Sequence, residues 1–421
     1  MGATLRVVVS RALPLAGALG TLLSLTGCSP APEEEYSASV GVLLDYTGTE
    51  ASGFNEERAF LMASHLMADA RQNELPFRVV YRDARDNPED ARSATLELAA
   101  EGVDLVIGPS TDRLAPIVGE VLGDTDIVLV SPNPTIGDIG TAEKPWFRMS
   151  PGNVTGSTTP SLLGEHLARE FVNREAQRVL IATDDDVYDI ELVTGFKRAL
   201  AARGGEVVAE LSEGSGQSRK VVDALNQGEV DAVLVATSVV PAARLITDVY
   251  SSVRRTPQWM LTPRLKSEAL MLNVPLGALD GAFGVSLRIP SRVSGCNDAP
   301  ADDCFGKAMQ KTWGEEAFEN THFMYDAAAV AFIAIDKVLR ENDGTIDRAH
   351  LSKAIFATAE RGGVLIGWND FPLAVEKARN GGNVQYSGVT GPIVFTESGS
   401  RVGGNTIVFE VHDHTFVDLS F

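Results

Sequence analysis

Short apolar runs alternate with amphipathic segments along most of this chain, and this alternation restricts the fold more than any other feature. The first apolar runs cover residues 40–46, 77–83, 103–109 and 127–132, with helical patterns over 56–70 and 88–100 between them. An apolar run without polar alternation is typical of a strand that is buried on both faces. Such strands need helices on both sides of a parallel sheet, so the pattern predicts a doubly wound α/β fold.

The same pattern then starts a second time. Apolar runs cover residues 178–184, 206–211, 230–237 and 258–263, and helical patterns cover 157–173, 190–203 and 218–226. Val103-Asp104 and Val230-Asp231 both follow an amphipathic helix and open an apolar strand, which indicates an internal duplication. The 421 residues, 44% of them hydrophobic, are enough for two cores. We therefore expect two doubly wound parallel-sheet lobes.

The last third of the chain mixes both kinds of element. We expect a strand over 281–287, helices over 305–313, 325–340 and 347–357, and strands over 391–396, 406–413 and 416–419. Because helices return after the second set of strands, the chain should cross between the lobes more than once.

The first 27 residues have the pattern of a signal peptide. Arg6 and Arg11 precede an apolar stretch, 12–25, that is too short to span a bilayer stably. The stretch ends in Leu-Thr-Gly-Cys, which resembles the bacterial lipobox and implies a lipid on Cys28. An uncleaved membrane anchor is the alternative, and the small residues before the cysteine argue against it.

Residues 28–37 are Pro-rich and acidic, which predicts an extended tether between the lipid and the folded body. Ser29 beside the lipidated cysteine resembles the sorting pattern for the outer membrane rather than the inner membrane. The expected location is therefore the periplasmic side of the cell envelope, with the lipid anchor as the contact with the membrane.

Charge and motifs exclude several functions. The chain has 57 acidic and 36 basic residues, and its net charge of −21 disfavours nucleic acid as a partner. The motifs of serine hydrolases, nucleotide-binding P-loops and zinc proteases are absent from the sequence, so we expect neither catalytic residues nor a cofactor. We interpret Asp184-Asp185-Asp186 as helix capping and His412-Asp413-His414 as a hairpin end, rather than as metal sites.

Cys296 and Cys304 lie in a polar, Pro-containing loop of a chain expected to be exported. This context predicts a disulfide between them. Metal binding is the alternative, but two thiols without a nearby histidine are too few ligands.

Polar residues follow two neighbouring strands of the first set. Ser110, Thr111 and Asp112 come after one strand, and Asn133 and Thr135 come after the next. Ligands of open α/β sheets bind beyond the carboxyl ends of the strands, so these groups predict a cradle for a small ligand. Helix capping is the alternative, but the acidic and aromatic strand end over 184–188 in the second lobe favours a ligand cleft.

Several segments keep the order and spacing of a known family. They are residues 40–44, Thr47-Gly48, Ile107-Gly108-Pro109, Ser131-Pro132, Phe147-Arg148, 182–188, 204–208 and 388–395. In these segments the chain resembles the type I periplasmic binding proteins of the leucine/isoleucine/valine-binding family, the receptors of amino-acid ABC importers.

The resemblance implies two lobes joined by a three-strand hinge, with ligand trapped between them by hinge closure. The crossings should lie near residues 150, 285 and 395. This gives a first lobe of 38–150 plus 286–395 and a second lobe of 151–285 plus 396–421. Closure about a hinge is the motion known for periplasmic binding proteins, so for this chain it is an expectation that comes from the family.

The resemblance also implies which residues bind ligand. Thr135 matches the family threonine, Asn133 stands where a backbone carbonyl holds the ligand ammonium, and Tyr188 matches the aromatic residue that closes from the second lobe. Asp112, next to Thr111, takes the place of the serine that binds the ligand carboxylate. Two further departures are Arg264 in place of an acid and Phe54 in place of a tyrosine.

These departures change the charges that a ligand would meet. Asp112 would repel a carboxylate and Arg264 would repel an ammonium, each by several kcal/mol at about 4 Å if partly dehydrated. We therefore expect that a simple branched-chain amino acid is not the preferred ligand. Two alternatives stay open. The ligand could have the opposite arrangement of charges, or Asp112 could pair with Arg264 across the closed cleft.

The sequence thus predicts a monomeric, lipid-anchored solute-binding protein that delivers a small polar, amino-acid-like ligand to an ABC transporter permease. The alternative is a sensor or regulatory envelope lipoprotein that uses the same fold to contact a protein partner. An enzyme is the least favoured class.

Overall fold

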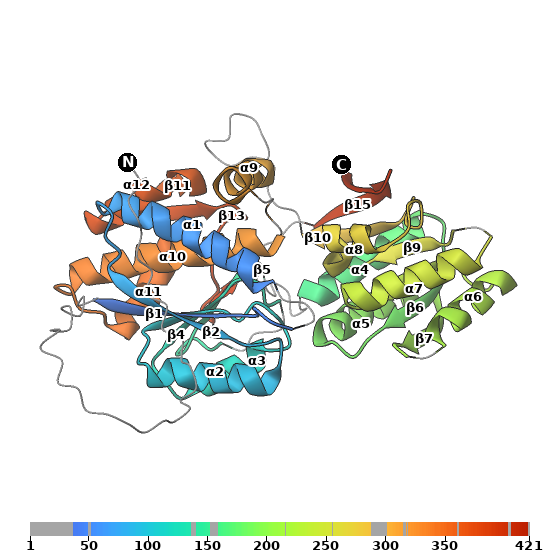
Figure 1. Ribbon diagram of the computed structural model, residues 1–421, viewed down its shortest axis with the longest axis horizontal. Coiled ribbons are helices and arrows are strands. Elements are labelled where there is room, and N and C mark those ends of the chain that lie inside the picture. Colours follow the sequence, from blue (N-terminus) through green and yellow to red (C-terminus); the bar gives the residue numbers. More distant parts are fainter. Residues whose placement is uncertain are drawn as a thin grey trace, which may run out of the picture.

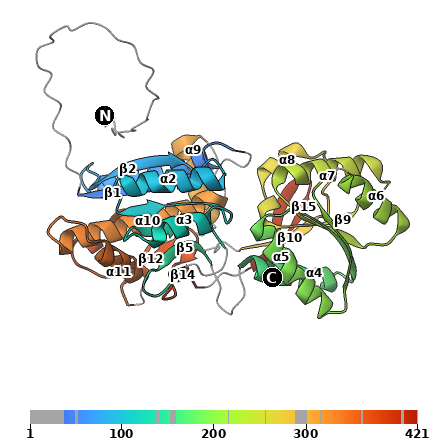
Figure 2. The same cartoon turned by 90° about the horizontal axis from the view of Figure 1, so that it is seen from below.

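The computed structural model describes residues 37–48, 52–135, 140–151, 159–214, 216–254, 256–287, 301–314, 317, 319–359, 362–402 and 406–419, without the side chains of 268, 301–303, 319 and 320. The chain forms two lobes that lie side by side (Figure 1). A view turned by 90° shows the same separation (Figure 2). Within the described ranges, every helix is too short or too polar to cross a membrane.

Six strands form the sheet of the first lobe. They are β1 (Ala38–Leu44), β2 (Phe77–Asp83), β3 (Leu105–Ile107), β4 (Val128–Ser131), β5 (Trp146–Pro151) and β14 (Ser400–Arg401). The strand order is β14-β5-β4-β3-β1-β2, and all of these pairs are parallel. Strand β1 is buried along its whole length, as its unbroken apolar run predicts.

Helices cover both faces of this sheet (Figure 1). Leu98 of α2 (Pro88–Ala100) and Val118 of α3 (Ala115–Gly123) pack against one face. The other face is covered by α1 (Gly53–Ala70), α9 (Ala301–Trp313), α10 (Glu319–Glu341), α11 (Arg348–Ala359) and α12 (Phe371–Arg379). A small sheet of β11 (Val364–Gly367), β12 (Val384–Gly388) and β13 (Gly391–Pro392), with the 3₁₀ turn η2 (Trp368–Asp370), joins this second layer.

Seven strands form the sheet of the second lobe. They are β6 (Arg178–Thr183), β7 (Glu206–Ser212), β8 (Ala232–Ala236), β9 (Gln258–Leu261), β10 (Phe283–Leu287), β15 (Thr406–His412) and β16 (Thr415–Leu419). The order is β16-β15-β10-β9-β8-β6-β7, with β15 and β16 antiparallel to their neighbours and the rest parallel. In β8, Leu234 packs into one layer and Val233 and Val235 into the other.

The helices of the second lobe also lie on both faces. One layer contains α4 (Thr159–Asn173) and α5 (Val187–Ala201). The other contains α6 (Gln217–Gln227), α7 (Val239–Ser252), α8 (Glu268–Asn273) and the 3₁₀ turn η1 (Pro263–Leu265).

The two lobes repeat the same order of strands, which confirms the prediction of two similar doubly wound lobes. In each sheet, the first strand of the lobe (β1 or β6) pairs with the second (β2 or β7) on one side and with the third (β3 or β8) on the other. The fourth and fifth strands follow the third, as β4 and β5 in the first lobe and β9 and β10 in the second. The carboxylate of Asp104 accepts a hydrogen bond from the backbone N–H of Ser39 at 2.9 Å, and that of Asp231 accepts one from Arg178 at 2.8 Å. The repeated Val-Asp pair therefore performs the same task in both lobes.

The chain passes between the lobes after β5, after β10 and before β15. The strands extend past the predicted lobe boundaries by more than one residue in two places. Residues 286 and 287 still belong to β10, and β14 pairs with β5 beyond residue 395. Buried Arg401 explains the second difference, because its guanidinium donates to the carbonyls of Met149, Thr390 and Pro392 at 2.8–2.9 Å and thereby holds this segment in the first lobe.

Candidate functional site

A cavity of about 190 Å³ lies between the two lobes, beyond the carboxyl ends of their strands. The first lobe contributes Ser52, Ser110, Thr111, Asp112, Asn133, Thr135, Ser150 and Phe323 to its lining. The second lobe contributes Leu163, Asp186, Tyr188, Pro263, Arg264 and Leu287. Because neither lobe encloses this space alone, a ligand in it would contact both.

A hydrogen bond joins the loops that follow β3 and β4. Gly108 has a φ of 125°, and a Cβ there would lie 2.1 Å from the carbonyl oxygen of Leu43, so only glycine fits. The hydroxyl of Ser131 donates to the carbonyl of Gly108 at 2.9 Å and accepts from the indole Nε1 of Trp146 at 2.6 Å. This contact brings the polar residues after the two strands together at one side of the cavity.

Asp112 and Thr135 form the first polar pair of the lining. The carboxylate of Asp112 accepts from the backbone N–H of Thr135 at 2.5 Å and from its hydroxyl at 2.8 Å. The negative charge of Asp112 is therefore met by two donors of its own lobe.

A second carboxylate, Glu56, lies directly behind the lining and is 0% exposed. It accepts from the hydroxyl of Ser110 at 2.6 Å, the hydroxyl of Ser52 at 3.2 Å and the Nδ2 of Asn133 at 3.2 Å. Three residues of the lining are thus oriented by one buried acid in the first turn of α1.

The second lobe contributes a guanidinium between two acids. Arg264 Nη1 lies 2.9 Å from Asp189 Oδ2 and 3.0 Å from Asp186 Oδ1, and its Cζ lies 5.9 Å from the ring centre of Tyr188. Asp189 has a side chain that is 0% exposed, so the pair is buried on that side. The guanidinium is also partly covered by the aromatic ring.

Two of the three aspartates after β6, Asp184 and Asp186, cap backbone groups, as predicted. Asp186 accepts from the backbone N–H of Tyr188 at 2.9 Å at the start of α5. Asp184 accepts from the N–H groups of Asp186 at 3.0 Å and Ser238 at 3.1 Å. The predicted hairpin end at His412 also occurs, between β15 and β16.

Seven of the eight residues predicted to bind ligand line this cavity: Ser110, Thr111, Asp112, Asn133, Thr135, Tyr188 and Arg264. Phe54 does not. Its ring lies in the first turn of α1, is 63% exposed and stacks edge-on against Tyr46 at 5.2 Å. Ser52, just before that helix, lines the cavity instead.

The structure adds protein partners for the two charges that were expected to repel an amino acid. Asp112 is bound by Thr135, and Arg264 is paired with Asp186 and Asp189, so each group has partners within its own lobe. Neither charge meets a ligand as an isolated charge. These partners lie within each lobe, whereas the sequence had left open only a pairing of Asp112 with Arg264 across the cleft; the expected ligand preference stays a prediction.

Glu56 was missed as a member of the site. An acid in the first turn of a helix is common because it favours the helix dipole, so its presence there carried no signal of its own. The sequence signal for Glu56 was Ser52, four residues earlier at the start of the helix, because side chains four residues apart on a helix are neighbours. Phe323 was also missed, because the predicted helix began only at Tyr325, whereas α10 begins at Glu319.

Asp45 lies beneath the start of α1, next to the site. It is 1% exposed, its carbonyl accepts from the N–H of Gly53 at 2.9 Å, and its carboxylate accepts from the N–H of Asp86 at 3.1 Å. Burial, with smaller contributions from the charges of Asp86 and Asp83, raises the pKa of Asp45 to about 6.

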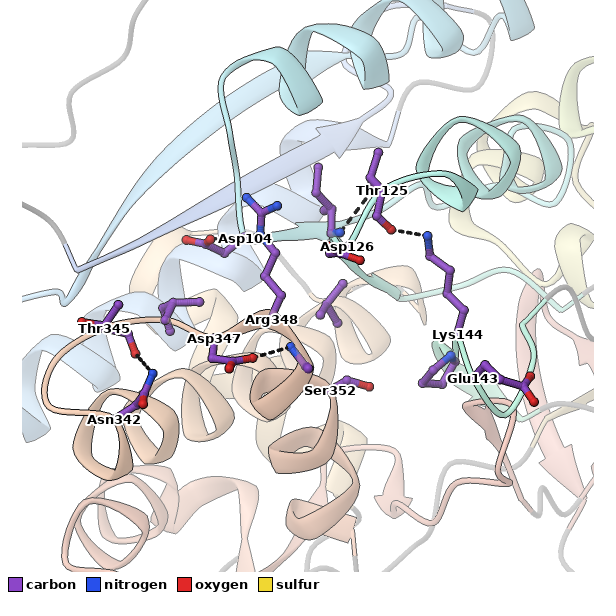
Figure 3. Close-up of a pocket in the computed structure, with 15 residues that line it drawn as sticks. Asp104, Thr125, Asp126, Glu143, Lys144, Asn342, Thr345, Asp347, Arg348 and Ser352 are labelled. Atoms are coloured by element: carbon purple, nitrogen blue, oxygen red, sulfur yellow. Dashed lines mark hydrogen bonds and ion pairs between the residues drawn. The ribbon is translucent and has the colours of Figure 1, made fainter.

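A larger cavity, of about 830 Å³, lies at the amino ends of strands β3, β4 and β5 of the first sheet (Figure 3). Its two cations already bind protein groups. Lys144 Nζ donates to the carbonyl of Leu122 at 2.6 Å and also to that of Thr125, and Arg348 Nε lies 3.2 Å from Asp104. The smaller cavity is the candidate ligand site, because it lies at the carboxyl ends of the strands and both lobes line it.

The cysteine predictions fall largely outside the described residues. Cys304 is disulfide-bonded. Its predicted partner, Cys296, lies outside the described residues, and so does the predicted lipidation site, Cys28. The pairing and the lipid therefore stay predictions.

Comparisons with known proteins agree with this architecture. The chain is similar to a leucine-binding protein from Thermotoga maritima, with 17% identity, a TM-score of 0.70, and coverage of 91% of this chain and 98% of that one. It is also similar to a branched-chain amino acid transporter substrate-binding protein from Streptococcus pneumoniae, solved with isoleucine, at 15% identity and a TM-score of 0.68, with 91% and 100% covered.

A third similar structure is an ABC transporter solute-binding protein from R. palustris in complex with benzoate. It shares 17% identity at a TM-score of 0.67, with 91% of this chain and 95% of that chain covered. Among curated protein sequences, none matches significantly. The model of the family described as periplasmic binding protein matches residues 37–415, and the chain therefore belongs to the periplasmic binding protein family.

Proposed function

We propose that the protein is a lipid-anchored solute-binding protein of an ABC importer that holds a small polar ligand between its lobes by hinge closure. The observation that carries this proposal is the cavity lined by both lobes. Thr135 and Ser110 approach it from one side, and Tyr188 and Arg264 from the other. The proposed role is binding and delivery of a solute, without catalysis.

The size of the cavity supports a small ligand. Its volume of about 190 Å³ is below the roughly 300–1,000 Å³ of sites for drug-sized molecules. Similar structures hold isoleucine in one case and benzoate in another. A solute of that size would touch both lobes and so favour the closed form.

The anchor belongs to the same proposal. The lipid would be attached to Cys28, and the tether of residues 28–37 would end where β1 begins at Ala38. This arrangement would hold a monomeric body on the periplasmic side of the envelope, at the outer membrane in preference to the inner one, from which it would deliver solute to a permease.

Thermal unfolding in the presence of candidate solutes tests the proposal. The panel contains amino acids, amides, amines, short peptides and organic acids. A ligand at 100 times its dissociation constant stabilises by about 2.7 kcal/mol, which raises the Tm by a few degrees. Thr135→Ala and Tyr188→Ala should abolish the shift, and Thr194→Ala, at an exposed position on α5, should keep it.

A panel in which no compound raises the Tm would contradict the solute-binding proposal. It would favour the sensor or regulatory lipoprotein that contacts a protein partner.

A further inference from the structure

The hydroxyl groups on the first-lobe side of the cavity are already used as donors. Ser110 and Ser52 donate to Glu56, and Thr135 donates to Asp112. A hydroxyl has one hydrogen and two lone pairs, so what these three groups present to a ligand is acceptor oxygen. A ligand that contacts these three hydroxyls must therefore supply the hydrogen atoms.

The charged residues in and behind the lining also favour a ligand that carries hydrogen-bond donors and a positive charge. The charged residues of the described lining are Asp112, Asp186 and Arg264. Glu56 stands directly behind Ser110, and Asp189 directly behind Arg264. Among the described residues in and directly behind the lining, four carboxylates thus stand against one guanidinium. The field in a space with low-dielectric walls therefore favours a positive charge.

Aromatic and apolar side chains complete the lining. Tyr188 and Phe323 present rings, which attract cations through their faces. Leu163 and Leu287 present alkyl surface from the second lobe. Thr111 Oγ1 is buried and has no hydrogen-bond partner within the described part of the chain, which leaves one more polar atom for a ligand.

We propose that the ligand is a small organic cation, with N–H donors that point at the first lobe and an apolar body against the leucines of the second. This inference rests on the proposed function as a solute-binding protein. A ligand carboxylate has only acceptors, so at the hydroxyls of Ser52, Ser110 and Thr135 it would face acceptor oxygens backed by Glu56 and Asp112. The carboxylate of a zwitterionic amino acid would be disfavoured there for the same reason.

Calorimetric titration of the protein with matched compounds tests the ligand class. Each set shares one side chain and differs in its charged groups: 3-methylbutylamine, leucine and 4-methylpentanoate; phenethylamine, phenylalanine and 3-phenylpropanoate; agmatine, arginine and 5-guanidinopentanoate. We expect at least one set to bind, with its carboxylate-free cation at least about tenfold tighter than the amino acid, which corresponds to about 1.4 kcal/mol. In each set, the carboxylate that lacks the α-amine should bind most weakly.

The outcomes separate the ligand class from the function. Tightest binding of an amino acid, an anion or a neutral amide overturns the cation while the solute-binding function stands. Absence of binding by all nine compounds, together with a panel that never shifts the Tm, overturns the function and the cation with it. Absence of binding by the nine with a hit elsewhere in the panel overturns the cation unless that hit is itself a carboxylate-free cation.

Glu56→Gln tests the source of the preference, because glutamine keeps the size of the side chain and removes its charge. The variant should reduce the preference for the cation over the amino acid by about tenfold, as hydrogen bonds to charged groups are the stronger ones. Glu206→Gln, at the exposed start of β7, should leave the preference unchanged. If Glu56→Gln does not fold, Asp186→Asn removes a charge from the lining itself. An unchanged preference in a folded variant would overturn the assignment to these carboxylates.

Discussion

Asp112 and Thr135 follow different strands, yet the carboxylate of the first accepts from both the backbone N–H and the hydroxyl of the second, at 2.5 and 2.8 Å. This contact joins the loops after β3 and β4 at the wall of the cleft. Asp112, which stands where the resemblance implies a serine, thereby helps to hold the wall of the cavity together.

Replacing Asp112 by alanine should lower the free energy of unfolding by about 1–3 kcal/mol, because the Thr135 N–H loses its acceptor. Asp112→Asn keeps an acceptor and should cost less. Urea unfolding measures both, and Asp223→Ala, at an exposed position on α6, is the control, which should stay within about 0.5 kcal/mol of the wild type. Equal stability of Asp112→Ala and the control would show that the contact contributes nothing.

Arg264→Leu should destabilise the protein by about 3 kcal/mol, because it leaves the buried carboxylate of Asp189 without its guanidinium. The double variant with Asp189→Asn should recover part of this loss, since the uncompensated charge is then gone. Denaturant unfolding of the two variants measures the recovery. If the double variant is less stable than the single one, the buried pair is not the cause.

Gly108→Ala should be strongly destabilising, by about 2 kcal/mol or more, because its Cβ would collide with the backbone of β1 and its φ is positive. Gly102→Ala is the matched control. Gly102 also has a positive φ, 71°, but a Cβ there has open space, so only the cost of about 1 kcal/mol for the left-handed backbone remains. Equal losses in urea unfolding would contradict the close approach at Gly108.

Asp45 predicts a pH dependence of stability. Its pKa is raised from the ordinary value of 3.8 to about 6, so between these values the folded state holds a proton that the unfolded state releases. The contribution of Asp45 to stability is therefore present in full below about pH 4, declines as the pH rises to about 6, and is then lost, by about 2–3 kcal/mol in total.

Asp45→Asn isolates this effect from the other titrating groups. Urea unfolding at pH 4, 5, 6 and 7 should show the stability of the wild type relative to this variant falling as the pH rises. A difference that stays constant, or grows with pH, would contradict the raised pKa.

The sequence predicted well those elements that have a clear hydrophobic pattern. The apolar runs at residues 40–46 and 230–237 became β1 and β8, because strands buried on both faces must be apolar throughout. It was a poor guide to residues 391–401. Residues 391–396 were predicted as one strand, but β13 covers only Gly391–Pro392, and the pairing of β14 with β5 depends on the buried contacts of Arg401.

The candidate site shows the same division. The rule that ligands bind at carboxyl ends of strands located Ser110, Asn133 and Tyr188, because topology alone brings these ends together. The partners of Asp112 and Arg264 could not be inferred from the sequence. The sequence gives the charge of a side chain, but not which groups from other segments will lie within hydrogen-bond distance of it.

The most direct test of the central claim is the distance between the two lobes with and without ligand. Spin labels on Glu89→Cys in the first lobe and Lys220→Cys in the second occupy exposed positions away from the cleft. Double electron–electron resonance should show the distance distribution shift and narrow when the tightest-binding compound is added, and Tyr188→Ala should prevent this. Binding that leaves the distribution unchanged would contradict capture of a solute between the lobes.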